Sequence, residues 1–185
     1  MKDLINSSIN KHSEALQLID KVDIINSANM ILKGINNGNT IFWCGNGGSA
    51  SQANHLSAEL LGGMYQKKIK PFKSICLNVD TGFITAWSND DSFDNIFSRQ
   101  LEALSKPGDI LVGLSTSGNS PNILNSAIFA QSNQLKVISL TGNDGGKLKK
   151  SSDININIPI NSTQRIQEMH ILVGHIICDI IETSF

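Results

Sequence analysis

The chain has 185 residues, of which 40% are hydrophobic and 17% are charged, and its formal net charge is -1. This composition fits one globular α/β domain and excludes a protein that binds nucleic acid through a strongly basic surface. No apolar run approaches the ~20 residues that span a bilayer, and the N-terminus has no signal-peptide pattern. We therefore expect a cytoplasmic protein that binds small molecules or copies of itself, and neither nucleic acid nor membrane.

Residues 3–36 are predicted to form one long helix, because apolar residues recur at intervals of three and four. Two interpretations of its apolar stripe remain open: it helps to build an oligomer, or it packs back onto the sheet of its own chain. The predicted organisation is a single domain, residues 1–185. Its N-terminal oligomerisation helix covers residues 1–37 and its α/β core covers residues 38–185.

Residues 40–60 contain a strand, a glycine turn and a helix. Residues 41–44 form a short apolar run of the kind found in buried parallel strands. Gly45, Gly47 and Gly48 allow a sharp turn whose N–H groups can approach a ligand. Ser49 is expected to cap the helix that follows.

That helix carries His55 and Glu59 four residues apart, so both side chains project from one face. By itself the pair is most simply a solvated pair on a helix surface. A partner elsewhere in the chain would make it a candidate metal-binding or acid–base pair.

The remainder of the chain alternates strands with helices. Strands are expected at residues 74–77, 110–114, 136–140 and 154–158, and helices at 81–87 and 94–104. The basic residues Lys67, Lys68 and Lys70 are expected in a solvated connection. The pattern predicts a three-layer α/β/α fold with a five-stranded parallel sheet of the flavodoxin type, in which ligands collect at the carboxyl ends of the strands.

A hydroxyl-rich loop, residues 115–120, follows the third strand. Pro121 suits the first helical position and Ser120 the N-cap position. Ser115, Thr116 and Ser117 add three further hydroxyls beside the positive end of the helix dipole. Capping alone accounts for Ser120 but not for the other three, so we interpret the loop as a phosphate site.

Residues 162–182 are predicted to form a helix that carries Gln167 and His175. His175 lies in an apolar run, so we expect it to be buried and to need a partner. By itself it is most simply a core histidine with a hydrogen-bonding partner, but His55 and Glu59 are candidates to pair with it through a shared metal. Eight residues, or ~12 Å of helix, separate Gln167 from His175. Either a metal lies between two extended side chains or the site draws on more than one subunit, and we predict a site at a subunit interface.

Taken together, these motifs resemble the sugar isomerase (SIS) domain and, within it, the phosphoheptose isomerases. The resemblance rests on residues 44–50 (Cys-Gly-Asn-Gly-Gly-Ser-Ala), 55–60 (His-Leu-Ser-Ala-Glu-Leu), 97–104 (Phe-Ser-Arg-Gln-Leu-Glu-Ala-Leu), 115–122 (Ser-Thr-Ser-Gly-Asn-Ser-Pro-Asn), 140–148 (Leu-Thr-Gly-Asn-Asp-Gly-Gly-Lys-Leu) and 165–175 (Arg-Ile-Gln-Glu-Met-His-Ile-Leu-Val-Gly-His).

The resemblance implies a homotetramer that interconverts sedoheptulose 7-phosphate and D-glycero-D-manno-heptose 7-phosphate. This reaction is the first step towards activated heptose for bacterial surface polysaccharide, such as lipopolysaccharide or capsule. It also implies one zinc ion per subunit, bound by His55, Glu59, Gln167 and His175. The implied acid–base pair is Glu59 and His175. The implied substrate contacts are Asn46, Gly47, Gly48, Glu59, Asn89, Asp90, Ser115, Thr116, Ser117, Ser120 and Gln167.

Isomerisation through an enediol needs a base, a group that moves the hydroxyl proton, and an electrophile. We assign the base to Glu59 and the hydroxyl proton to His175, although these two roles can be exchanged. Two other functions stay open: a non-catalytic SIS regulator of the replication-initiator-associating type, and an isomerase of another ketose phosphate. The resemblance implies that such regulators lack the acidic residue and the histidine that stand here at 59 and 175.

Overall fold

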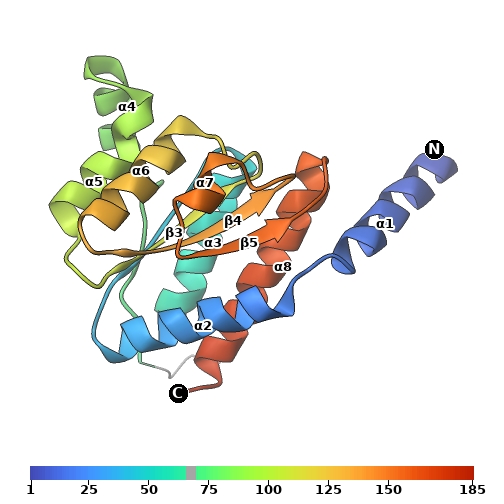
Figure 1. The fold of residues 1–185 in the computed structure, drawn as a ribbon, viewed down its shortest axis with the longest axis horizontal. Coiled ribbons are helices and arrows are strands. Elements are labelled where there is room, and N and C mark those ends of the chain that lie inside the picture. The colour runs from blue at the N-terminus through green and yellow to red at the C-terminus, as the bar shows by residue number, and fades with distance from the viewer. Residues whose placement is uncertain (66–69) are drawn as a thin grey trace.

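The computed structural model describes residues 1–65 and 70–185, which fold around one parallel sheet (Figure 1). Its strands are β1 Ile41–Gly45, β2 Ser74–Cys76, β3 Ile110–Ser115, β4 Lys136–Gly142 and β5 Ile154–Ile158. They pair in parallel in the order β2-β1-β3-β4-β5, which confirms the predicted five-stranded sheet of the flavodoxin type. Lys67 and Lys68, predicted to lie in a solvated connection, are outside the described residues.

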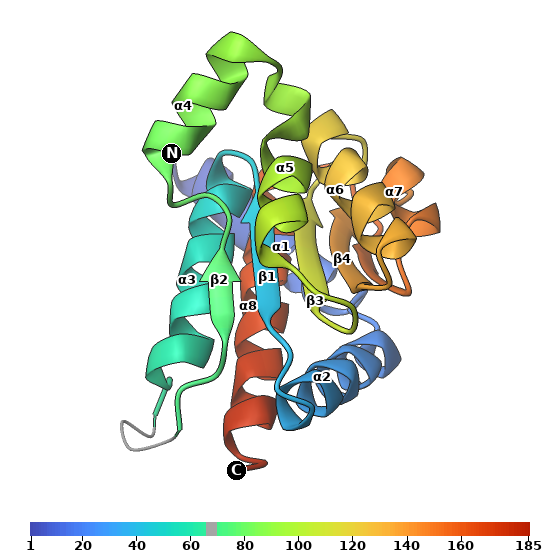
Figure 2. The ribbon, with the colours of Figure 1, turned by 90° about the vertical axis from the view of Figure 1, so that its left-hand side faces the viewer.

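Helices cover both faces of the sheet (Figures 1 and 2). They are α1 Lys2–Leu16, α2 Lys21–Asn36, α3 Gly48–Gly62, α4 Thr81–Asp90, the 3-10 turn η1 Phe93–Asn95, α5 Ile96–Leu104, α6 Pro121–Ser132, α7 Gly146–Lys150 and α8 Thr163–Glu182.

Strand β1 shows how the two faces are built, because successive side chains of a strand point to opposite sides. Ile41 and Trp43 pack in one buried cluster with residues of α2, α3 and α8. Phe42 and Cys44 pack in a second cluster with residues of α5, α6 and α7. The core therefore lies on both sides of the sheet, as expected for a three-layer fold.

The prediction of one long N-terminal helix is wrong, because residues 17–20 separate α1 from α2. Asp20 caps the second helix by accepting a hydrogen bond from the Val22 N–H at 2.8 Å. This N-cap favours the start of a new helix at Lys21 over the continuation of α1. Helix α2 packs on the sheet of its own chain and buries Ile31 completely. Helix α1 buries Ala15 alone and projects from the body (Figure 1).

Two side chains of α8 hold the projecting helix. The His12 Nδ1 and Glu168 Oε2 atoms lie 2.6 Å apart, and Arg165 donates to the Ser8 carbonyl at 2.6 Å. The outer side of α1 leaves Leu4, Ile5 and Ile9 more than half exposed. Each of the two interpretations of the N-terminal region thus applies to a different helix: α2 packs on its own sheet, and α1 offers an apolar face.

We expect Ile31→Ala to lower the free energy of unfolding by about 2–5 kcal/mol, because it removes a fully buried side chain and leaves a cavity between α2 and the sheet. The matched control is Ile128→Ala on α6, where the side chain is 48% exposed and the expected change is within about 0.5 kcal/mol. Urea unfolding of both variants measures the difference. Equal losses would contradict the packing of α2 described above.

The three cysteines are buried and free, and burial raises the pKa of the Cys44 and Cys178 thiols to about 12. They therefore stay protonated and serve as packing residues. Within the described ranges, none of the helices combines the length and apolar character needed to cross a membrane.

Candidate active site

The glycine turn, residues 45–48, joins β1 to α3 at the carboxyl edge of the sheet. Gly45 has no room for a side chain, since a Cβ there would lie 2.5 Å from the Ser49 carbonyl group. Gly47 has a φ of 55° and occupies the N-cap position, so the prediction that Ser49 caps the helix is wrong. Asn78, which follows β2, grips the turn by accepting from the Gly45 N–H and donating to its carbonyl.

The glycine turn and the serine loop, residues 115–120, meet side by side, because β1 and β3 are neighbours in the sheet. Asn46 and Asn122 join them through two reciprocal carboxamide hydrogen bonds of 2.8 and 2.9 Å. Asn78 and Asn122 were not among the predicted site residues. The signal that could have found them is a polar side chain placed directly after a buried strand or at the start of a helix on the ligand edge.

The hydroxyls of the serine loop are ordered by contacts within the loop. Ser120 is the N-cap residue of α6 and Pro121 its first residue, as predicted, but the Ser120 hydroxyl pairs with that of Ser115 at 3.1 Å and does not cap the helix. The Ser117 hydroxyl accepts from the Asn119 N–H, so its own proton remains available to a ligand oxygen. This arrangement at a helix N-terminus suits an anion.

Two histidines and a glutamate come together on α3 and α8. His55 Nε2 lies 2.8 Å from His175 Nε2 and 3.5 Å from Glu59 Oε1. At this distance one imidazole must donate a hydrogen bond to the other, so one of the two Nε2 atoms carries a proton and the other accepts it. His175 was expected to be buried; it is instead of intermediate exposure, because it lies on the side of α8 that faces His55 and not the core. The expected proximity of His175 to His55 agrees with this contact, while the expected pairing through a shared metal stays a prediction.

The donor set of this cluster fits zinc chemistry, since imidazole nitrogen and carboxylate oxygen are zinc ligands. Two nitrogens bound to one tetrahedral ion lie about 3.3 Å apart, so the histidines need to separate only slightly from their hydrogen-bonded distance. Over residues 1–65 and 70–185, no three His, Cys, Asp or Glu side chains are already spaced to hold a metal. The set of zinc ligands therefore remains a prediction. Glu59, His55 and His175 are the predicted ligands that the structure brings closest together.

Gln167 lies against the glycine turn. Its carboxamide nitrogen and oxygen would be 2.7 and 2.8 Å from a Cβ at Gly48, so a side chain there would displace the Gln167 amide from the turn. Gln52 on α3 holds this part of α8 by donating to the Gln167 carbonyl at 2.6 Å. The amide is thus placed beside the predicted substrate turn, two helical turns before His175, and its role as a metal ligand is untested.

Asn89 and Asp90 form the end of α4, a helix that projects past the carboxyl ends of the strands (Figure 2). This helix is longer than predicted, ending at Asp90 and not at Trp87. Both side chains are exposed, and Asn89 donates to Asp90 at 2.8 Å. Their contact with substrate remains a prediction.

His170 on α8 is completely buried, and its Nε2–H donates to the Thr141 carbonyl at 3.0 Å. Burial lowers the pKa of its imidazole from 6.5 to about 4, while the Thr141 contact opposes this shift. The unfolded chain therefore binds more protons below about pH 6.5, and stability falls as the pH drops from there towards 4.

We expect this residue to cost about 2 kcal/mol of stability between about pH 7 and about pH 5. His170→Gln keeps a donor for Thr141 but does not titrate, so its unfolding free energy should fall less over the same interval. Urea unfolding at the two pH values measures the difference. An identical decline in both proteins would show that His170 is not the titrating group.

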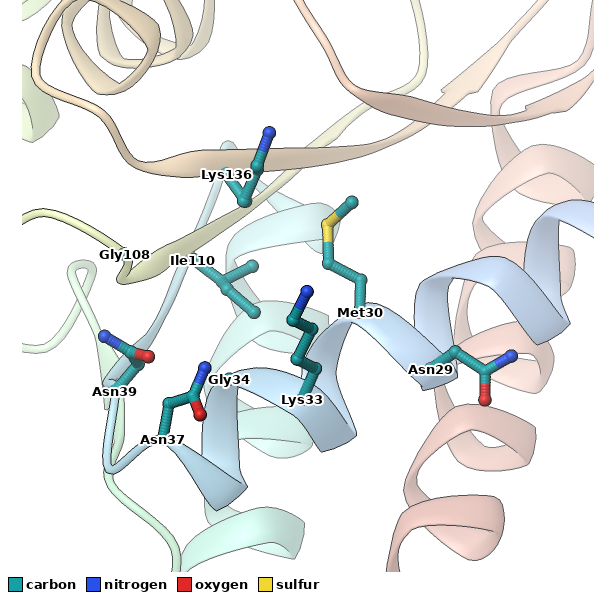
Figure 3. A pocket seen from close by; sticks show the side chains of 9 residues that line it. All are labelled: Asn29, Met30, Lys33, Gly34, Asn37, Asn39, Gly108, Ile110 and Lys136. Carbon is teal, nitrogen blue, oxygen red and sulfur yellow. The ribbon is translucent and has the colours of Figure 1, made fainter.

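A cavity of about 420 Å³ lies at the amino edge of the sheet, opposite the glycine turn (Figure 3). Met30 and Lys33 from α2 and the strand residues Ile110 and Lys136 contribute to its wall. It contains none of the predicted site residues. The cavity is therefore separate from the site at the carboxyl edge.

The family model described as the SIS domain matches residues 6–142, a range that includes the glycine turn and the serine loop. A phosphoheptose isomerase from Helicobacter hepaticus is 46% identical over 100% of this chain and 94% of that protein. A phosphoheptose isomerase structure from Neisseria gonorrhoeae superposes with a TM-score of 0.92 at 37% identity, covering 98% of each chain. One from Francisella tularensis gives a TM-score of 0.91 at 34% identity, covering 98% of this chain and 96% of that one. The chain belongs to the phosphoheptose isomerase family.

Proposed function

We propose that this protein interconverts sedoheptulose 7-phosphate and D-glycero-D-manno-heptose 7-phosphate, and so supplies heptose for surface polysaccharide. Family membership supports the reaction class. The observation that carries the assignment to this site is the cluster formed by His55 and Glu59 of α3, the helix that starts from the glycine turn, with His175 of α8. It combines a carboxylate base with imidazoles that can pass a proton.

The serine loop binds the phosphate through hydroxyl and N–H groups and the α6 N-terminus, and the glycine turn and Gln167 orient the sugar. Glu59 removes a proton from C1 of the ketose, and the electron pair left behind forms the C1–C2 double bond of an enediol. His175 carries a proton from the C1 hydroxyl to the C2 oxygen. Glu59 then returns its proton to C2, which leaves an aldehyde at C1 and a hydroxyl at C2.

A zinc ion fits this scheme as a group held by His55, Glu59, His175 and Gln167. When bound, it supplies positive charge that stabilises the developing oxyanion. His55 would hold the ion through an imidazole nitrogen, and Glu59 would serve as both ligand and base. We propose one ion per subunit.

We also propose a homotetramer whose subunit interfaces contribute to the active sites. Two observations support it: α1 presents the exposed apolar residues Leu4, Ile5 and Ile9, and α4 buries none of its residues in the single chain. Helix α1 contacts α8, which carries His175, and α4 projects past the carboxyl ends of the strands, where the glycine turn lies (Figure 2). Apolar faces of this kind are commonly covered by a second subunit.

The choice of substrate is tested by comparing ketose phosphates of seven, six and five carbons as substrates of the same preparation. The expected result is a kcat/KM for sedoheptulose 7-phosphate at least about tenfold above that of the shorter sugars, since lost hydroxyl contacts leave site groups unpaired. An equal or higher kcat/KM for a hexulose or pentulose phosphate would favour the isomerase of another ketose phosphate.

A further inference from the structure

The segment that packs against the serine loop from behind has no role in the scheme above. We call residues 142–148, which lead from the end of β4 into α7, the bracing loop. Its residues belong to one of the motifs that mark the family resemblance, but none of them is among the predicted catalytic, substrate or metal residues.

Three N–H groups of the bracing loop donate to the serine loop. The Gly142 N–H donates to the Thr116 carbonyl at 3.1 Å, and the Leu148 N–H donates to the Gly118 carbonyl at 2.9 Å. The Lys147 N–H donates to the Asn119 carboxamide oxygen at 3.1 Å. Each of these bonds uses an acceptor of the serine loop. The N–H and hydroxyl donors of the serine loop, which a phosphate needs, therefore remain free of hydrogen bonds to the bracing loop.

Glycines set the spacing between the two loops. A Cβ at Gly146 would lie 2.6 Å from the Ser117 carbonyl oxygen and from the Gly118 carbonyl group. A Cβ at Gly118 would overlap the Gly145 carbonyl. Gly118 and Gly146 also have φ angles of +63° and +57°, which side-chain-bearing residues seldom adopt. The backbones of the two loops are therefore in direct contact, and a side chain at Gly118 or Gly146 would have to move the serine loop.

The bracing loop is itself anchored. Asp144 accepts from the Gly146 N–H at 3.0 Å, and Asn157 of β5 donates to the Asn143 carbonyl at 3.0 Å. Leu148 is buried in the core. Because these contacts fix the position of the bracing loop, they also restrict the position of the serine loop that it contacts.

We propose that the bracing loop is a positioning element of the phosphate site. Gly145 and Gly146 hold the serine loop where its hydroxyl and N–H groups converge on one phosphate, although the brace does not touch the ligand. The inference deepens the proposed function and rests on it for the identity of the sugar, while its phosphate-binding consequence is independent of turnover. A displacement of the serine loop therefore weakens binding of the phosphate more than it slows the chemistry at Glu59.

Gly146→Ala tests the proposal, with Gly38→Ala as its matched control. Gly38 has a φ of +72° and open space around it, and it lies at the amino edge, so its substitution introduces similar backbone strain without touching the site. The expected dissociation constant for inorganic phosphate, measured by calorimetry, rises by about tenfold or more in Gly146→Ala, equivalent to one lost hydrogen bond to a charged group. It changes by less than about twofold in Gly38→Ala.

With sedoheptulose 7-phosphate, Gly146→Ala should raise KM by a similar factor and leave kcat within about threefold. If that variant does not fold, Asn119→Ala serves instead, because it adds no atom and removes both the contact with the Lys147 N–H and the donation of Asn119 to the Ser117 carbonyl. A rise of about threefold or more is expected. An unchanged phosphate affinity in a folded variant, or equal changes in Gly146→Ala and Gly38→Ala, would overturn the proposal. Unaltered protein that binds phosphate but turns over no sugar would refute the proposed reaction alone, and unaltered protein that binds no phosphate would refute both.

Discussion

Glu59→Gln is expected to lower kcat by a factor of about 10²–10⁴, because the amide has the shape of the carboxylate but cannot accept the C1 proton. Glu59 lies 3.5 Å from His55 and its side chain is 20% exposed, so the substitution fits without repacking the core. Steady-state turnover of sedoheptulose 7-phosphate measures the effect. KM should change far less than kcat, since the lost interaction belongs to the transition state.

The matched control is Glu102→Gln on α5. Glu102 is 56% exposed and forms an ion pair with Arg99 on the helix surface, away from the glycine turn. Removing a surface ion pair has little effect, so its kcat should stay within about twofold of the unaltered protein. A Glu59→Gln protein that retains full kcat would assign the base to another residue, and His175 would be the first to examine through His175→Asn.

Removing divalent metal is expected to reduce turnover by about 10²-fold or more, because the oxyanion then loses its positive partner. Added zinc should restore it. The same experiment on His55→Asn should show little zinc in the purified protein and no restoration, since an asparagine at this position removes one imidazole ligand. Metal content by mass spectrometry and turnover are measured on the same samples.

His12→Asn is the control for metal loading. His12 also contacts a carboxylate, that of Glu168 at 2.6 Å, but lies on α1 outside the cluster of His55, Glu59 and His175. This variant should retain about one zinc ion per chain. Full turnover by protein that contains no detectable divalent metal would contradict the metal assignment while leaving the acid–base roles of Glu59 and His175 intact.

Most of the sheet was predictable because buried parallel strands leave a simple signal. The run at β5 was predicted with its observed bounds, and the others were misplaced by one or two residues at their carboxyl ends, where the chain turns into polar loops. The N-terminal region was harder. Periodicity at three and four residues continues across the break at 17–20, and only the Asp20 cap shows that a second helix begins there.

The site was predictable where spacing along a helix fixes geometry, and less so where it depends on neighbouring strands. His55 and Glu59 share a face by their spacing alone. The apolar context of His175 predicted a burial that the structure does not show, although His175 does contact His55. The asparagines that bind the loops to one another, Asn78 and Asn122, act through contacts between segments remote in sequence. Such contacts depend on strand order, which periodicity does not reveal.

The most direct test of the proposed isomerisation is turnover of sedoheptulose 7-phosphate by the zinc-loaded protein in heavy water, followed by nuclear magnetic resonance. We expect the aldose 7-phosphate to form with solvent deuterium at C2, because the proton that Glu59 carries exchanges with water before it is returned. Folded protein that binds the sugar phosphate and leaves it unchanged would contradict the proposed reaction and favour a non-catalytic binding role.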